Sequence, residues 1–432
     1  MKISIPYGKT FLREEIPDQR LLGILESRLS GFEPENAPQE LIRTAMAAPV
    51  ESPLLSELAK DKKKIVILAS DHTRPVPSRL IIPEMLREIR QGNPKADITI
   101  LIATGCHRGT TEDELKMKFG EDIFRRERIV IHDCDSSEMK ELGTLPSGQT
   151  LTLNRLAADA DLLAAEGFIE PHFFAGFSGG RKSVLPGVAA REVVLGNHNG
   201  AFIAHPCSRT GILKGNRIHE DMLFAAKAAG LAYIVNVVLT PRHKVVYAVA
   251  GNPFRAHEKG CEFLRKYASV KLPGNAEADI VITSNGGYPL DQNVYQSVKG
   301  MTAAEAAVKM GGVIIMASGC ADGCGGDSFY RTFRDHKDMR ALMETFAETP
   351  PEKTIIDQWQ SQIFARVLSR AKVVFISEMP DETVRDFGMI PVHSLGEALR
   401  TADEILGRED GSVTVIPDGV GVIVEESSED DA

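Results

Sequence analysis

The sequence predicts an α/β protein made of two domains with mostly parallel sheets. Three observations predict this class. The chain has 432 residues, which is enough for two or three domains that each bury a core. Short apolar runs recur along the chain, as buried strands do. Helical patterns separate these runs, and alternating strands and helices are typical of parallel sheets because parallel neighbours need a crossover connection.

Eight apolar runs are expected as strands of these sheets. They occupy residues 64–70, 97–105, 128–133, 161–170, 232–240, 279–287, 312–319 and 372–377. Their Val, Ile and Leu content and their lack of polar alternation indicate strands that are buried on both faces. Helical periodicity marks the segments between them, such as residues 78–92 and 256–270.

The clearest domain boundary is the segment of residues 269–279, where Pro, Gly and Asn stand together between a helical pattern and a strand. We therefore expect an N-terminal α/β domain over residues 1–270 and a C-terminal α/β domain over residues 276–400. Near the end, Pro417, Asp418 and Gly419 predict the turn of a β-hairpin, and we expect residues 404–432 to rejoin the first domain. The acidic stretch that ends the chain is expected to be solvated.

The composition indicates which binding partners and which cellular compartment to expect. The net charge is −10 and no basic patch is evident, so nucleic acid is not an expected partner. No apolar run reaches the ~18 residues of a membrane span, and the N-terminus lacks the apolar core of a secretory signal. The six cysteines are scattered, which indicates reduced thiols and a cytoplasmic protein.

Four polar clusters follow four of the expected strands. They are SDHTRPVPS (70–78), TGCHRGTTEDE (104–114), EPHFFAGFSGGRKS (170–183) and SNGGYPLDQNVYQSVKG (284–300). In open α/β sheets, ligands bind beyond the carboxyl ends of the strands. The four clusters therefore predict one site, in a cleft at the junction of the two domains.

The third cluster is similar to a phosphate-binding loop but departs from its pattern. Counted from Gly176, a Walker A loop would end in Gly, Lys and Ser, yet Arg181 stands where the second glycine is required. This departure disfavours a nucleoside triphosphatase. Gly176 and Gly179 still allow backbone amides to approach an anion, so a phosphate nest for a smaller cofactor remains open beside an ordinary surface turn.

Two histidines, His107 and His172, stand at different strand ends. A neutral imidazole can give or take a proton near pH 7. Two of them on opposite faces of one carbon would suit an enzyme that inverts a stereocentre, whereas a single histidine is more often structural.

Other side chains in the clusters could bind a carboxylate or a metal. Arg74 can hold a carboxylate through two parallel hydrogen bonds. Tyr295, Gln296 and Lys299 can share one helical face. His198, in GNHNG, suits nickel, zinc, iron or copper, but it has no second ligand nearby and needs a cofactor to supply the others.

Three further features of the sequence can each be interpreted in two ways. The only tryptophan, Trp359, is either a core residue or a cleft-edge lid. Cys320 and Cys324 are a weak metal signal or plain thiols. The glycine-rich loop around them is a backbone nest or a flexible connector.

Together, these motifs resemble the nickel-dependent lactate racemases and their homologues. The resemblance covers nearly the whole chain and rests on DHTRPVPS, TGCHRG, EPHFFAGFSGGRKSVLPG, NHN, SNGGYPLDQNVYQSVKGMTAAE and DQWQ, in that order. It implies two α/β domains and a nickel-pincer nucleotide, a pyridinium-3-thioamide-5-thiocarboxylic acid mononucleotide with Ni. It also implies a reaction by reversible hydride transfer from the substrate α-carbon.

The resemblance assigns roles residue by residue. It implies that Lys182 holds the cofactor covalently, that His198 is the protein's metal ligand, and that His107 and His172 are the catalytic acid and base. The remaining cofactor-binding residues that it implies are Asp71, Gly176, Ser178 and Gly179. The substrate-binding residues that it implies are Arg74, Tyr295, Gln296, Lys299 and Trp359.

The function expected from the resemblance is a racemase or epimerase of a 2-hydroxy acid, with lactate as the leading substrate. Malate or a sugar acid is the alternative substrate, and cofactor-assembly enzymes are expected as transient partners. Two other classes stay open from the residues alone. One is a phosphate- or nucleotide-binding protein without chemistry, and the other is a zinc hydrolase that uses His198 with Cys320 or Cys324.

Overall fold

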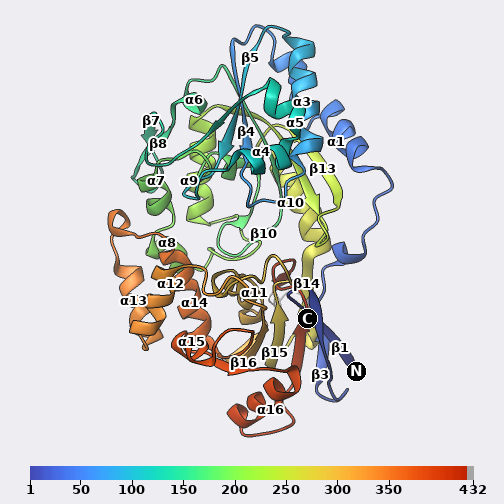
Figure 1. Ribbon diagram of the computed structural model, residues 1–432, viewed down its shortest axis with the longest axis vertical. Coiled ribbons are helices and arrows are strands. Elements are labelled where there is room, and N and C mark those ends of the chain that lie inside the picture. Colours follow the sequence, from blue (N-terminus) through green and yellow to red (C-terminus); the bar gives the residue numbers. More distant parts are fainter. Residues whose placement is uncertain (426–432) are drawn as a thin grey trace. The chain divides into compact units, whose positions relative to one another are not determined.

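The computed structural model describes residues 1–425 and divides into two compact units, each an α/β layered structure (Figure 1). The central unit comprises Leu29–His198 and Pro206–Lys266. The terminal unit comprises Met1–Arg28, Asn199–His205 and the chain from Tyr267 onward. Within the described residues, no helix combines the length and the apolarity needed to cross a membrane. The expected solvated tail comprises residues 425–432, of which all but Glu425 lie outside the described residues.

The central unit is built on a six-stranded sheet in the order β13–β12–β9–β4–β5–β6. Its strands are β4 (Lys64–Ser70), β5 (Asp97–Ala103), β6 (Arg128–Ile131), β9 (Leu162–Phe168), β12 (Leu231–Leu239) and β13 (Val245–Gly251). All neighbours run parallel except the antiparallel pair β12–β13. Every residue of β9 is buried, as its apolar run predicts for a strand with both faces covered.

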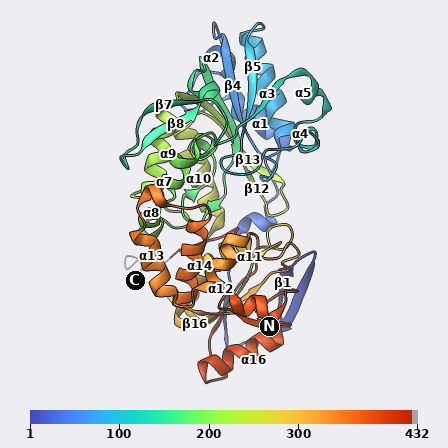
Figure 2. The same cartoon turned by 60° about the vertical axis from the view of Figure 1, so that its left-hand side comes forward.

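Helices cover both faces of this sheet. On one face α1 (Pro38–Ala47), α3 (Ser78–Gly92) and α4 (Glu112–Phe119) form an apolar core with the strands. On the other face α9 (Arg217–Ala228) packs against β12. Figure 2 shows α9 and α3 on opposite sides of the central unit. The unit also contains α2 (Leu55–Leu58), α5 (Glu121–Arg126), β7 (Met139–Thr144), β8 (Thr150–Asn154), α6 (Arg155–Ala158), β10 (Pro171–His172), β11 (Gly176–Phe177), η2 (Gly180–Ser183), α7 (Arg191–Asn197) and most of α10 (Arg255–Ala268).

The terminal unit is built on a second six-stranded sheet, in the order β18–β17–β16–β15–β19–β3. Its strands are β3 (Leu21–Ile24), β15 (Ala278–Ser284), β16 (Val308–Ala317), β17 (Lys372–Ile376), β18 (Ile390–Val392) and β19 (Val413–Ile416). All of them are parallel. The two sheets confirm the predicted fold class, and all eight apolar runs form strands.

In the terminal unit α16 (Leu395–Leu406) and the hairpin of β1 (Lys2–Tyr7) and β2 (Thr10–Glu15) cover one face of the sheet. Helices α11 (Val294–Glu305) and α14 (Gln358–Arg370) pack on β15 and β16 as well. The other elements are α8 (Gly200–Ala204), β14 (Ser269–Lys271), η3 (Pro273–Asn275), α12 (Asp327–Asp335), α13 (Met339–Glu348), η4 (Pro351–Lys353), α15 (Asp381–Asp386) and β20 (Ile423–Glu425). The short turn η1 (Arg28–Gly31) stands where the two units meet in the sequence.

The C-terminal segment differs from its prediction. Residues 404–432 were expected to join the N-terminal domain through a hairpin, but β19 inserts between β15 and β3 of the terminal sheet. Both edges of β19 are then paired, so it has no edge left for β20, which pairs with β14. The predicted turn residues instead close onto β15, where the Gly419 amide donates to the Ser284 carbonyl at 2.9 Å.

A close backbone contact at the end of α3 gives a test of the central unit's packing. A Cβ on Gly92 would lie 1.8 Å from the carbonyl oxygen of Ser56. We expect Gly92→Ala to lower the free energy of unfolding by about 1–3 kcal/mol, because backbone must shift to relieve the overlap. Gly31→Ala is the matched control, since a Cβ there meets nothing within 4 Å. Chemical denaturation measures both, and equal stabilities of the two variants would contradict the packing described here.

Candidate active site

Three of the four polar clusters lie at the carboxyl ends of adjacent strands in the central unit. They follow β9, β4 and β5, and β4 lies between the other two. Because the strands are parallel, the loops that follow them emerge at the same edge of the sheet. These three clusters therefore start from one edge of the central sheet. The fourth cluster follows β15 in the terminal unit, and the common site at the junction of the domains stays a prediction.

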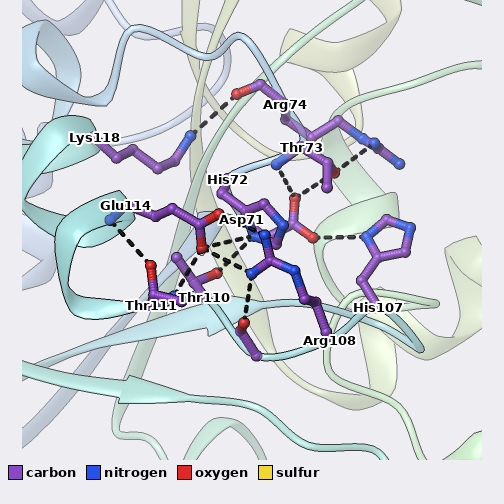
Figure 3. Close-up of polar contacts among 11 residues, drawn as sticks. Asp71, His72, Thr73, Arg74, His107, Arg108, Thr110, Thr111, Glu114 and Lys118 are labelled. Atoms are coloured by element: carbon purple, nitrogen blue, oxygen red, sulfur yellow. Dashed lines mark hydrogen bonds and ion pairs between the residues drawn. The ribbon is translucent and has the colours of Figure 1, made fainter. Parts of the chain in front are cut away.

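A buried carboxylate holds His107 at this edge (Figure 3). The Nδ1 atom of His107 lies 2.6 Å from Oδ2 of Asp71, which is 2% exposed. Thr73 donates to Oδ1 of Asp71 from its amide at 3.0 Å and from its hydroxyl at 2.6 Å. Burial acts to raise the pKa of Asp71, but the hydrogen bond and charge of His107, with Arg74 and Thr73, hold it well below its usual value.

An ionised Asp71 fixes the tautomer of His107. A carboxylate can only accept, so Nδ1 of His107 carries a proton and donates it. The Nε2 atom of a neutral His107 then holds the lone pair. The side chain of His107 is 46% exposed, so this atom can be reached by a ligand. The pair has the arrangement of a general base oriented by a carboxylate.

The loops after β4 and β5 are tied together at a second point. Nδ1 of His72 lies 3.2 Å from Oγ1 of Thr110, across the two loops. Glu114, at the start of α4, accepts from Arg108 through both carboxylate oxygens, at 2.6 and 2.9 Å. The Arg108 hydrogen bond holds the pKa of Glu114 down to about 2, so the ion pair persists across the physiological range. Figure 3 shows these contacts beside the pair of Asp71 and His107.

Arg74 is exposed on the same loop as Asp71. Its Nη1 atom donates to Oγ1 of Thr73 at 2.8 Å, and its carbonyl oxygen accepts from Nζ of Lys118 at 3.3 Å. The loop is stiffened by Pro75 and Pro77, whose ring closure fixes φ. Through Thr73, whose hydroxyl also donates to Asp71, the guanidinium is linked to the pair of Asp71 and His107 on a restrained backbone.

The loop after β9 brings a histidine and a lysine into contact. His172 pairs with Gly176 in the two-stranded hairpin of β10 and β11. Its Nε2 atom lies 3.1 Å from Nζ of Lys182, and its Nδ1 atom accepts from the amide of Ala175 at 3.3 Å. A neutral His172 that accepts at Nδ1 carries its proton on Nε2 and can donate it to an unprotonated Lys182 amine.

His198, directly after the last residue of α7, lies close to His172 and Lys182. Its ring is 4% exposed, and its Nδ1 atom lies 3.0 Å from the carbonyl oxygen of Val194. Burial, together with the charge of Lys182, lowers the pKa of His198 to about 3, so the imidazole is neutral. A carbonyl can only accept, so Nδ1 carries the proton and Nε2 holds a lone pair. Metal-ligating histidines have this second hydrogen bond to protein.

The ring of Phe174 stands between these groups. Its centroid lies 4.5 Å from the ring of His172, 5.1 Å from the ring of His198 and 5.5 Å from Nζ of Lys182. The structure thus brings together three residues that were predicted separately, and it adds Phe174, which the sequence analysis did not single out. The sequence could have pointed to Phe174, because it lies between two predicted site residues in the segment HFFAGF.

Arg181, the residue that departs from the Walker A pattern, is a core residue. It is 1% exposed, and its guanidinium donates to the carbonyl oxygens of Ala175 at 2.9 Å and Gly179 at 3.2 Å. Its Nε atom donates to Nδ1 of His219 at 3.0 Å, and its Nη1 atom lies 3.0 Å from Nε2 of His257. The glycine-rich loop is therefore wrapped around a buried cation.

The predicted cofactor-binding positions Gly176, Ser178 and Gly179 all lie in this wrapped loop. Gly179 has φ of +80°, and a Cβ there would lie 2.7 Å from Oδ1 of Asn236. The hydroxyl of Ser178 donates to the Phe168 carbonyl at 3.1 Å and so helps to shape the loop. Gly176 also has a positive φ, of +76°. These three residues set the backbone course that leads to Lys182.

The candidates in the terminal unit share a helical face as predicted. Tyr295, Gln296 and Lys299 are the half-buried residues in the first half of α11, whereas the residues between them are buried. The Tyr295 hydroxyl donates to Oδ1 of Asp357 at 2.8 Å. Trp359, in the first turn of α14, is half-buried.

The candidate metal ligands outside the cofactor hypothesis form no protein-only site. In residues 1–425, the one group of three His, Cys, Asp or Glu donors close enough to share an ion is Asp133, Cys134 and Asp135. Asp135 there already binds Arg191 through both oxygens at 2.6 Å. His198, Cys320 and Cys324 are not part of that group.

The fold and this site define an α/β enzyme that carries paired imidazoles at the carboxyl ends of parallel strands. Residues 7–211 match the lactate racemase N-terminal domain, and residues 274–424 match the lactate racemase C-terminal domain. The chain belongs to the lactate racemase family, which confirms the resemblance seen in its motifs.

Individual relatives match over the full length. The chain is 53% identical to the lactate racemase of Thermoanaerobacterium thermosaccharolyticum over 427 residues, which cover 98% of this chain and 99% of that one. It is 48% identical to the lactate racemase of Lactiplantibacillus plantarum over 425 residues, with coverages of 98% and 99%. The structure of the T. thermosaccharolyticum lactate racemase apoprotein matches with a TM-score of 0.95 at 52% identity, covering 99% of this chain and 100% of that one. These relatives are isomerases.

The buried histidines beside Arg181 predict an acid-labile central unit. Burial and the charge of Arg181 lower the pKa of His219 to about 3 from 6.5, and they lower that of His257 as well. The unfolded chain therefore binds more protons below pH 6.5, so the stability is complete above that pH and declines as the pH falls. We expect the Tm to fall between pH 7 and pH 5, and to fall less in His219→Gln. The exposed His336→Gln should keep the wild-type slope, and identical slopes for all three proteins would contradict this account.

Proposed function

We propose that the protein interconverts the two enantiomers of lactate, with His107 and His172 as its proton-transferring groups. The observation that carries the proposal is the clustering at one sheet edge. A carboxylate-oriented imidazole follows β5, and a second imidazole in contact with a lysine follows β9. The full-length similarity to lactate racemases supports the choice of substrate.

His107 is suited to take the hydroxyl proton of the substrate. Its Nε2 lone pair is the accepting atom, and the ionised Asp71 stabilises the imidazolium that results. His172, on the loop that follows β9, would serve the opposite face of the substrate carbon. Inversion of a stereocentre needs one such group for each face.

Arg74 would bind the substrate carboxylate. Its guanidinium can form two parallel hydrogen bonds to a carboxylate, and Thr73 already orients one of its nitrogens. We propose that Lys299 adds a second positive charge from the terminal unit, and that Tyr295, Gln296 and Trp359 line the same pocket. A bound carboxylate makes the α-hydrogen hard to remove as a proton, because a second negative charge would develop beside the first.

The donor set fits a nickel-pincer nucleotide. His198 offers one neutral imidazole nitrogen, and the pincer ligand supplies the other donors that a tetragonal nickel site prefers. Lys182 offers an amine whose contact with His172 suits the unprotonated form that bonds to a carbonyl or thiocarbonyl carbon. When bound, the cofactor supplies a reversible hydride acceptor for the α-carbon.

The chain's own loop would hold the rest of the nucleotide. Gly176 and Gly179, both with positive φ, allow the backbone of this loop to approach a phosphate group closely, and the buried charge of Arg181 behind them would favour an anion. Asp71 is the remaining residue that we assign to this side of the site. Enzymes that assemble the cofactor would be the transient partners of this loop.

The test uses protein produced together with the cofactor-assembly enzymes. We expect L-lactate to be converted to a mixture of both enantiomers by chiral chromatography, with about one nickel per chain and an added mass on Lys182. Lys182→Ala should lose the added mass and the activity. Lys140→Ala, at a surface lysine paired with Asp159, is the control and should keep both. Full racemisation by Lys182→Ala would overturn the proposed role of the lysine. A parallel assay of malate and sugar acids identifies the alternative substrates.

A second variant tests the orientation of His107. Asp71→Asn removes the carboxylate that accepts from Nδ1, and an amide can donate there instead and hold the wrong tautomer. We expect kcat to fall by about 10²–10⁴-fold while the added mass on Lys182 is retained. Asp159→Asn, at an exposed carboxylate of the same unit, should leave kcat unchanged. An Asp71→Asn enzyme with wild-type kcat would exclude this role.

A further inference from the structure

A glutamate lies in the middle of the apolar core beneath the site. Glu166 belongs to β9, whose residues are all buried, and it is itself 1% exposed. Ionised or polar groups in such a strand cost free energy unless they are bonded. In the strand sequence LLAAEGF, Glu166 is therefore a residue whose presence the formation of a buried strand does not explain.

One oxygen of Glu166 holds both ends of the loop that carries Asp71 and Arg74. Its Oε1 atom accepts from the Ser78 hydroxyl at 2.6 Å, and from the amide and the hydroxyl of Ser70, each at 3.3 Å. Ser70 is the last residue of β4, and Ser78 is the first residue of α3. The loop is therefore fixed at its entry and at its exit to one atom.

Lys118, in the last turn of α4, holds the middle of the same loop. Its Nζ atom donates to the carbonyl oxygen of Arg74 at 3.3 Å, as Figure 3 shows. Burial lowers the pKa of Lys118 and raises that of Glu166, while each charge acts on the other to oppose the shift. The second oxygen of Glu166, Oε2, has no hydrogen-bond partner among the described residues.

We propose that Glu166 is a positioning residue which, together with Lys118, holds residues 71–77 in the shape that presents Arg74 to the substrate carboxylate. The inference rests on the proposed function, because it assigns Arg74 to substrate binding. Glu166 itself touches no reacting atom. Glu166 contacts the loop at Ser70 and Ser78, and Lys118 contacts it at Arg74. Asp71 directly follows the first of these points.

If Glu166 mainly stabilised the fold, its replacement would have different effects from those of a positioning residue. A buried carboxyl group is weak support for stability, and an apolar residue would serve β9 at least as well. A positioning role predicts that the loop loosens while the fold persists. The affinity for the carboxylate should then fall more than kcat, because the position of Arg74 is what changes.

The experiment compares Glu166→Gln with Glu84→Gln in the cofactor-loaded enzyme. Glu84 is the matched control because it is also a buried glutamate of the central unit, bonded to Arg43, Gln39 and Arg87, but away from the loop. We expect Glu166→Gln to raise the KM for lactate about tenfold with a change in kcat below about threefold. Lys118→Met should do the same. Glu84→Gln should lower the Tm and leave the KM unchanged.

Amide hydrogen exchange of the 70–78 segment gives a readout that does not depend on activity. Faster exchange confined to this segment in Glu166→Gln supports the proposal, and unchanged exchange with unchanged KM overturns it. If Glu166→Gln fails to fold, Ser78→Ala removes the shortest of the three bonds and should show a smaller effect of the same kind. If the wild-type enzyme does not racemise lactate, the proposed function fails, and the exchange experiment still decides whether Glu166 holds the loop.

Discussion

The pairing of β9, β4 and β5 as adjacent parallel strands is the constraint on which the site depends. Ile67 of β4 pairs with Ala164 on one side and with Ile100 on the other. This register brings the ends of three strands level, so loops that are about 35 and 65 residues apart in the chain start from one edge. No local feature of the loops could do this, because each of them alone is a turn with a few polar side chains.

Charge placement at that edge follows one physical pattern. Arg181, a buried cation, lies beside His219 and His257, whose imidazoles are kept neutral by burial and by the charge of Arg181. The carboxylate of Asp71 lies beside His107 and accepts a hydrogen bond from Nδ1 of its imidazole. In each case burial makes one protonation state costly, and the neighbour selects the other.

Most strands of the fold could be predicted, and several features of the site could not. The eight apolar runs form strands because two-sided burial needs continuous Val, Ile and Leu. The position of β19 could not be predicted, since a four-residue strand contains no information about its neighbours. Likewise His107, His172 and Lys182 are visible as motif residues, but Arg181, Glu166 and Lys118 act through buried contacts with residues far away in sequence. Their signal was weak: a charged residue in an apolar strand or in a glycine-rich loop.

The terminal unit combines strands from the beginning and the end of the sequence, and this has a consequence for folding during translation. Its edge strand β3 comes from residues 21–24, and its one pairing strand within residues 1–425, β19, comes from residues 413–416. During synthesis β3 therefore has no partner in the sheet until residues 413–416 have left the ribosome. The central sheet, whose last strand ends at Gly251, is complete long before that. Translation therefore supplies every strand of the central sheet first and leaves β3 without its sheet partner until β19 has been made.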